Sequence, residues 1–223
     1  MKKTEKGKGG GGAAAVEKMK EIPKKAVLYF HGRGGSGAEA EHYKALFPGY
    51  EVTGPDYRSE TPWEAKEELK ETVLAAKEKY ETVLLIANSV GAYFAMTAGI
   101  EKQIEKAYFI SPVVDMPGLI SGMMRQAGVT EEELKKKGEI LTDSGEILSW
   151  KYLSWARAHP ARWRAEAEIL YGKNDPLTGF ETMRDFAGRN GMRLTVMENG
   201  GHWFHTEGEM RFLDEWIRRG QTR

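Results

Sequence analysis

Short apolar runs alternate with longer amphipathic segments along most of this chain. The apolar runs are rich in β-branched and aromatic residues, and they predict strands near residues 26–30, 50–53, 82–87, 107–110, 168–171 and 193–197. Apolar residues at helical spacing predict helices near residues 63–79, 90–100, 179–190 and 207–219. Alternating strands and helices are typical of right-handed crossovers, so we expect a parallel sheet covered by helices on both faces.

Residues 112–165 interrupt this alternation between the fourth and fifth predicted strands. The stretch GVTEEELKKKG begins with Thr130 and Glu133 at the spacing of a helix capping box. The stretch GEILTDSGEILSW holds two short strand-like runs about an Asp-Ser-Gly turn. We expect this insertion to form a small cap over the carboxyl ends of the strands.

Length and composition favour a single domain over residues 25–223. A chain of 223 residues with 40% hydrophobic content is long enough to bury one sizeable core. The first dozen residues are rich in lysine and glycine and have little apolar area to bury. We therefore expect residues 1–24 to form a disordered tail and a lead-in to the domain.

Charge and cysteine content exclude several classes of function. Basic and acidic residues balance at 33 each, so no overall positive field would attract nucleic acid. There is no cysteine, which removes disulfides, thiolate catalysis and zinc–thiolate sites. No apolar run approaches the roughly 20 residues of a membrane span, and the start of the chain lacks the apolar core of a signal peptide. We expect a cytoplasmic protein that does not bind a membrane.

A chemical motif follows the third predicted strand, in the stretch ETVLLIANSVGAYFAM. Ser89 lies between this strand and the next predicted helix, and a serine that projects its hydroxyl from such a turn has a strained backbone. Small residues are needed two positions before and after it, because strand and helix cross closely there. Ala87 and Gly91 meet this need, although the usual pattern of this turn has glycine two residues before the serine. The alternative is a serine that only caps the helix.

Two further polar residues follow later strands. Asp175 comes after the fifth predicted strand, in the turn GKNDP, and His202 follows the sixth. The two glycines before His202 allow the chain to turn so that this side chain reaches back over the sheet. A serine nucleophile needs a base, and the base needs a carboxylate to orient it.

The order Ser89, Asp175, His202, each just beyond a different strand, resembles that of the α/β-hydrolase superfamily. The resemblance covers residues 25–219 and implies an α/β-hydrolase fold: a mostly parallel six-stranded sheet, helices on both faces, and a small cap inserted after the fourth strand. It also implies Ser89 as nucleophile, His202 as general base and then acid, and Asp175 as the carboxylate that orients His202. Backbone N–H groups of Arg33 and Val90 would bind the oxyanion.

The glycine-rich stretch AVLYFHGRGGSGAE after the first strand has two interpretations. Gly32, Gly34 and Gly37 match the G-x-G-x-x-G fingerprint of dinucleotide-binding proteins, with Asp56 at a suitable distance downstream. The same stretch contains His-Gly-x-Gly-Gly, which resembles the oxyanion loop of an α/β-hydrolase. We prefer the oxyanion loop, because a dinucleotide site would leave the serine, aspartate and histidine unexplained as a set.

The family resemblance has implications for the sheet and for cofactors. The two strands that usually open this fold have no patterned counterpart before Ala26, so we expect the strand order 4-3-5-6-7-8 in the family's naming. A Ser-His-Asp mechanism needs no cofactor and no metal. His202 and His205 lack the spacing of a helical zinc site, and no third ligand clusters near them in the sequence.

Other polar residues compete for roles in the site. Asp115, just past the fourth strand, is the rival to Asp175, because some hydrolases take their acid from that position. We prefer Asp175 for its Gly-x-x-Asp-Pro turn. His31 could act as a base, but the histidine of such a loop usually braces the turn. We interpret Asp56 and Asp143 as loop and turn carboxylates.

The insertion supplies large apolar side chains above the expected site. They are Trp150, Tyr152, Trp155, Trp163, Met123 and Met124. Such residues hold an insertion to its domain more often than they line a pocket. If Trp150, Trp155 and Met123 line the substrate pocket, that pocket suits an acyl or aryl group better than a sugar or a phosphate.

The resemblance implies a serine hydrolase, and we expect one that cleaves a carboxylic ester of a small or medium acyl or aryl substrate through an acyl-enzyme. The alternatives are a thioesterase, peptidase or acyltransferase on the same triad, or a non-catalytic binding protein of the same fold. Fold and triad do not determine the leaving group. The expected partner is a small-molecule substrate, and the sequence leaves the oligomeric state open.

Overall fold

The computed structural model describes residues 24–222 of the chain, so the expected tail over residues 1–24 lies outside the described residues except for Lys24. Six strands form one sheet in the order β2-β1-β3-β4-β7-β8, and all neighbouring strands are parallel. This order matches the predicted order 4-3-5-6-7-8, because β2, β1, β3, β4, β7 and β8 correspond to those strands in the same sequence. The strands are β1 Lys25–Phe30, β2 Glu51–Thr53, β3 Thr82–Asn88, β4 Lys106–Ile110, β7 Glu166–Gly172 and β8 Arg193–Met197. A separate antiparallel pair consists of β5 Glu139–Leu141 and β6 Ile147–Ser149.

Helices connect the strands on both sides of the sheet. The α-helices are α1 Ala40–Tyr43, α2 Pro62–Lys79, α3 Ser89–Ala98, α4 Met116–Gln126, α5 Glu131–Lys137, α6 Trp150–Ala158, α7 Phe180–Arg189 and α8 Glu207–Gln221. Short 3₁₀ helices are η1 Gly37–Glu39, η2 Lys44–Leu46 and η3 Glu101–Gln103. The four helices predicted from periodicity correspond to α2, α3, α7 and α8. Helix α3 ends earlier than the predicted residue 100 because Gly99 takes a left-handed conformation, with φ 74°.

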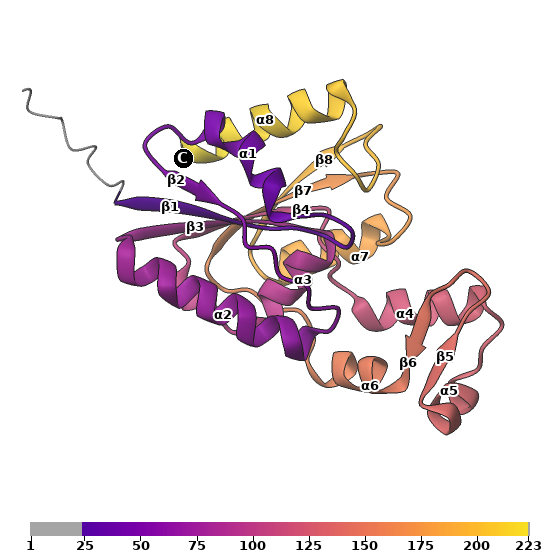
Figure 1. The fold of residues 1–223 in the computed structure, drawn as a ribbon. Coiled ribbons are helices and arrows are strands. Elements are labelled where there is room, and N and C mark those ends of the chain that lie inside the picture. Colours follow the sequence, from indigo (N-terminus) through magenta and orange to yellow (C-terminus); the bar gives the residue numbers. More distant parts are fainter. Residues whose placement is uncertain (1–23, 223) are drawn as a thin grey trace, which may run out of the picture.

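Both faces of the sheet are buried, which explains why its strands are continuous apolar runs. In β3, Leu84 and Ile86 pack on the face covered by α1 and α8. Leu85 and Ala87 pack on the opposite face, which α2, α3 and α7 cover. Figure 1 shows the two helical layers above and below the sheet. The predicted fold class is confirmed.

The segment between β4 and β7 carries α4, α5, the β5–β6 hairpin and α6 (Figure 1). The predicted capping box is present: the Thr130 hydroxyl accepts the N–H of Glu133 at 3.2 Å, and the Glu133 carboxylate accepts the N–H of Thr130 at 3.0 Å. The predicted hairpin about Asp-Ser-Gly is also present. Leu134, Leu148 and Leu153 are buried in a cluster continuous with the core under α2 and α3. The segment therefore packs onto the domain through apolar side chains.

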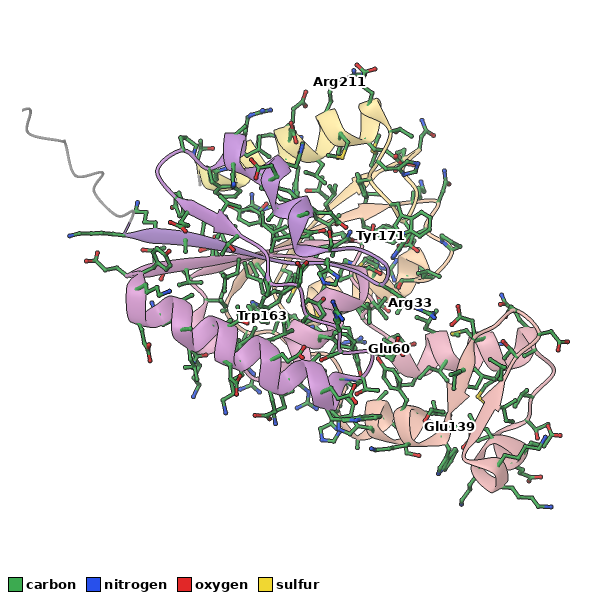
Figure 2. All side chains as sticks on the ribbon, viewed as in Figure 1. Arg33, Glu60, Glu139, Trp163, Tyr171 and Arg211 are labelled. Carbon is green, nitrogen blue, oxygen red and sulfur yellow. The ribbon has the colours of Figure 1, made fainter. Side chains whose placement is uncertain are left out.

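Trp163 belongs to the core of the sheet. It is 1% exposed, and its ring meets that of Phe109 in β4 edge-on with centroids 5.2 Å apart. It lies on the sheet face that α2, α3 and α7 cover (Figure 2). The cap aromatics could either pack or line a pocket, and for Trp163 the structure shows packing.

Leu69 and Leu74 lie on the same helix, α2, but only Leu69 is fully buried, whereas Leu74 is 43% exposed. Leu69→Ala should lower the free energy of unfolding by about 2–5 kcal/mol, because it leaves a cavity between α2 and the sheet. The matched change Leu74→Ala should cost less than about 1 kcal/mol. Urea unfolding followed by circular dichroism measures both values. Equal losses would contradict the buried face assigned to α2.

Candidate active site

Ser89 is the first residue of α3 and follows the carboxyl end of β3 directly. Its φ of 53° lies in the left-handed region, where a non-glycine residue costs about 1–3 kcal/mol. Asn88, not Ser89, occupies the N-cap position of α3. Ser89 therefore does not cap the helix, which was the alternative interpretation. The turn has the strained backbone that the motif predicts.

Two glycines allow backbone segments to meet around Ser89. A Cβ added at Gly91 would lie 2.3 Å from the carbonyl oxygen of His31, so α3 crosses the end of β1 at backbone contact. A Cβ added at Gly32 would lie 3.0 Å from the Cβ of Ser89. The loop after β1 thus lies directly beside the Ser89 side chain.

His202 lies in the loop between β8 and α8, which crosses the end of β7 closely. A Cβ on Gly172 would lie 2.1 Å from the carbonyl oxygen of Gly201, which leaves room for glycine alone. The imidazole Nε2 is 2.8 Å from Ser89 Oγ, and Nδ1 is 2.7 Å from Asp175 Oδ2. The structure therefore brings together the three side chains that the sequence singled out.

Asp175 is held in the turn after β7 by backbone donors. Its Oδ1 accepts the N–H of Leu177 at 2.7 Å and that of Thr178 at 3.4 Å, which leaves Oδ2 for His202. The Asp175 side chain is fully buried and that of His202 is 8% exposed. Because a carboxylate can only accept, Nδ1 of His202 carries the proton of this pair, and Nε2 of the neutral ring accepts from the Ser89 hydroxyl.

The rival acid, Asp115, has a different role in the structure. It is exposed and is the N-cap of α4, where its side chain accepts the N–H of Gly118 at 3.0 Å. Asp143 lies exposed in the turn between β5 and β6, as expected. His205 is exposed and directly precedes Thr206, the N-cap of α8.

The glycine-rich loop is braced by two carboxylates. Asp56 accepts the N–H of Gly37 at 2.8 Å. Glu39 accepts the N–H of Ser36 at 3.0 Å and also bonds the hydroxyl of Tyr29. The loop leads into the short helices η1 and α1 rather than into one long helix at the third glycine. This geometry does not fit the dinucleotide interpretation, in which Asp56 would face a ribose.

His31 braces the same loop. Its Nδ1 lies 2.9 Å from the carbonyl oxygen of Gly32, and its ring stacks on Tyr57 with centroids 4.2 Å apart. The hydroxyl of Tyr57 donates to the His31 carbonyl oxygen. Burial raises the pKa of Tyr57, which keeps this hydroxyl a donor. His31 thus makes the bracing contacts preferred for it.

Arg33 and Val90 flank Ser89 from two segments. Val90 lies in the first turn of α3, whose leading N–H groups have no carbonyl partner within the helix. Arg33 follows Gly32 in the loop beside Ser89, and its side chain pairs with Glu146 of the β5–β6 hairpin. Arg33 lies at the side of the sheet that faces the inserted segment (Figure 2). The guanidinium of Arg33 therefore bonds to the inserted segment. That the backbone N–H of Arg33 binds an oxyanion stays a prediction.

The three candidate pocket residues of the cap are partly buried against the common core. Trp155 stacks on His159 with centroids 4.2 Å apart and meets Trp63 of α2 edge-on. Trp150 lies under the ammonium of Lys135, and Met123 is half-buried in α4. These contacts are of the packing kind, and a pocket role for Trp150, Trp155 and Met123 stays a prediction.

Three bracing residues were not identified from the sequence: Glu39, Tyr57 and Glu209. Glu39 and Glu209 each occupy the third position of a helix whose N-cap is a serine or threonine, Ser36 and Thr206. The S/T-x-x-E spacing could have revealed both. No comparable signal exists for Tyr57, because its contact with His31 joins separate loops.

Within residues 24–222, no group of three or more His, Asp or Glu side chains is placed to hold a metal ion. In the same part of the chain, no helix has both the length and the apolar content needed to cross a membrane.

Comparison with known proteins identifies the fold. No protein-family profile and no curated protein sequence matches the chain. Est1E from Butyrivibrio proteoclasticus matches with a TM-score of 0.71 and 16% identity, over 91% of this chain and 90% of that one, and a structure of Est1E with ferulic acid bound matches with a TM-score of 0.68. Alpha/beta hydrolase domain-containing protein 10 from mouse matches with a TM-score of 0.65 and 16% identity, over 88% and 89% of the chains. A proline iminopeptidase-related protein from Thermus thermophilus matches with a TM-score of 0.60 and 21% identity, over 89% of each chain. The chain therefore has the α/β-hydrolase fold.

The crossing of α3 over β1 can be tested at Gly91. Gly91→Ala should lower the free energy of unfolding by about 1–3 kcal/mol or more, because the new methyl group would overlap the His31 carbonyl oxygen. Gly188→Ala in α7 is the matched control: its Cβ meets nothing within 4 Å, so the change should be neutral or stabilise the helix by up to about 1 kcal/mol. Urea unfolding measures both. A stable Gly91→Ala protein would show that the crossing is looser than described.

Proposed function

We propose that the protein is a serine hydrolase that cleaves a carboxylic ester of a small or medium acyl or aryl substrate. The observation that carries this proposal is the hydrogen-bonded chain from Ser89 through His202 to Asp175, with distances of 2.8 and 2.7 Å. Each member lies just beyond a different strand of a sheet with the α/β-hydrolase fold. A strained serine, a base within reach and a buried orienting carboxylate together are what nucleophilic catalysis requires.

In this mechanism Ser89 Oγ attacks the ester carbonyl while His202 Nε2 takes the hydroxyl proton. Asp175 accepts the hydrogen bond from Nδ1 and so orients the ring and stabilises the imidazolium that forms. Backbone N–H groups of Arg33 and Val90 would stabilise the negative charge that develops on the carbonyl oxygen. His202 then protonates the leaving alcohol, and the acyl group stays on Ser89.

Hydrolysis of the acyl-enzyme uses the same groups in reverse. His202 removes a proton from a water molecule, which attacks the acyl carbonyl. The tetrahedral intermediate then collapses as His202 returns this proton to Ser89 Oγ, which releases the acid and restores the Ser89 hydroxyl. These steps need no cofactor or metal. The same groups would also serve a thioesterase, a peptidase or an acyltransferase, because the leaving group is not part of the triad.

Two considerations favour an ester of an acyl or aryl acid among these substrates. The segment inserted between β4 and β7 carries Trp150, Trp155 and Met123, which suit an apolar acid if they line the pocket. The Est1E structure with ferulic acid bound, a carboxylic acid with an aromatic ring, shares this fold at low sequence identity. We therefore start the search for a substrate with acyl and aryl esters.

A fluorophosphonate probe tests the proposal directly, because it reacts with a serine only where neighbouring groups activate the hydroxyl. The wild-type protein should be labelled at Ser89 and should hydrolyse short-chain p-nitrophenyl esters. Ser89→Ala should abolish labelling and lower turnover by a factor on the order of 10⁶. Ser111→Ala is the control, since Ser111 also follows a strand with a positive φ, 42°, and is fully buried. It should keep the label.

If the folded protein shows neither labelling nor hydrolysis across a series of acyl lengths, this result contradicts an enzymatic role. It then favours the non-catalytic binding protein. Labelling at Ser89 without ester turnover would keep the triad and redirect the search to thioesters, peptides or acyl transfer.

The two aspartates should behave differently. Asp175→Asn should leave the protein folded but lower kcat by a factor on the order of 10⁴, because an asparagine at this position favours the wrong tautomer of His202. Asp115→Asn should change kcat little, since Asp115 caps α4. Ester hydrolysis together with circular dichroism separates catalysis from folding. The reverse pattern would place the acid after β4 instead of β7.

A further inference from the structure

The loop that carries His202 has little apolar anchoring of its own. Trp203, directly after His202, is 66% exposed, and His205 is exposed as well. Phe204 is the buried side chain among residues 203–205. Among residues 203–205, apolar side-chain packing is therefore provided by Phe204, and on the other side of His202 the loop backbone packs against Gly172 at Gly201. The position of the imidazole also depends on the hydrogen bonds that the loop backbone makes.

The carboxylate of Glu209, in the first turn of α8, bonds this loop on both sides of His202. Its Oε1 accepts the N–H of Gly201 at 3.0 Å, the residue immediately before His202. Its Oε2 accepts the N–H of His205 at 3.3 Å, the N–H of Thr206 at 3.1 Å and the hydroxyl of Thr206 at 2.8 Å. Glu209 is 8% exposed, so these bonds form largely away from solvent.

A helix cap alone does not account for this arrangement. The capping box of α5 has the same Thr-x-x-Glu pattern, and there Glu133 accepts the N–H and hydroxyl of Thr130 while remaining exposed. The contacts of Glu209 with Thr206 are of this kind. Its bonds to Gly201 and His205 are additional, and they join the residues that flank His202.

We propose that Glu209 is a positioning residue for His202. Its carboxylate joins Gly201 to His205, the two ends of the His202 loop, and so holds the imidazole between Ser89 and Asp175. The residue acts through His202 and does not touch the reacting atoms. The proposal rests on the proposed function, because it concerns the side chain that serves there as the base.

The charge of Glu209 suits this role. Burial disfavours its ionised form, but hydrogen bonds from Gly201, Thr206 and His205 outweigh burial and lower the pKa of this carboxyl to about 2. Both oxygens therefore accept hydrogen bonds throughout the neutral range. A glutamine keeps the size of the side chain but replaces one acceptor by an NH₂ donor, which would oppose an N–H of the loop.

Kinetics of Glu209→Gln give the first test. We expect kcat for ester hydrolysis to fall about 10- to 100-fold with KM little changed, because a displacement of about 1 Å at a catalytic group can cost a factor of about 100 in rate. Glu133→Gln is the matched control, since it alters the same capping pattern at α5 and should leave kcat unchanged. Thr206→Ala removes the cap hydroxyl but keeps the Gly201 bond, and should lower Tm while nearly preserving kcat.

A nuclear magnetic resonance measurement gives a second test that needs no turnover. In protein labelled with ¹⁵N-histidine, the Nδ1 proton that His202 donates to Asp175 should exchange slowly with water, because the pair is buried. Glu209→Gln should accelerate this exchange several-fold by loosening the loop, and Glu133→Gln should not.

The outcomes separate this proposal from the proposed function. If the exchange rate and kcat of Glu209→Gln equal those of the wild type, Glu209 is a helix cap only and the proposal is wrong. If the wild-type protein hydrolyses no ester, the proposed function fails, and the exchange rate alone decides the role of Glu209. If Glu209→Gln does not fold, Glu209→Asp takes its place: it keeps the charge but is one methylene too short to bond both ends of the loop, so the same acceleration is expected.

Discussion

Parallel pairing of the strands is the constraint on which the candidate site depends, because it puts the carboxyl ends of β3, β7 and β8 at one edge of the sheet. The turns after these strands carry Ser89, Asp175 and His202. Side chains far apart in the sequence then meet within hydrogen-bond distance, as the 2.8 Å contact between Ser89 and His202 shows. A parallel sheet needs helical crossovers, and those helices bury both of its faces.

Close backbone contact converts this arrangement into a fixed geometry. At Gly91 the helix after Ser89 crosses β1, at Gly172 the end of β7 meets the loop that carries His202, and at Gly37 the glycine-rich loop meets Gly54. A methyl group at any of these positions would overlap a backbone oxygen. The three loops around the site are therefore positioned by main-chain contact, which leaves less freedom than side-chain packing does.

Carboxylates complete the loops that the sheet cannot hold by itself. Glu39 and Asp56 accept backbone N–H groups of the glycine-rich loop, Asp175 accepts those of its own turn, and Glu209 accepts those on both sides of His202. Loops leave backbone donors without partners, and an ionised acceptor satisfies several of them at once. The same type of interaction thus shapes each loop at the edge of the sheet.

The sequence by itself determined the features that depend on local pattern. Continuous apolar runs and helical periodicity predicted the strands of the large sheet and its long helices, small residues around Ser89 predicted the strained turn, and Thr130 with Glu133 predicted a capping box that is present. Only the tertiary structure decided features that depend on how separate loops meet. It assigned Asp115 to a helix cap and Asp175 to His202, placed Trp163 in the core, paired Arg33 with Glu146 and joined Glu209 to Gly201. Local pattern reflects neighbours within a few residues along the chain, whereas these contacts follow from strand register and loop path, to which residues far apart in the sequence contribute together.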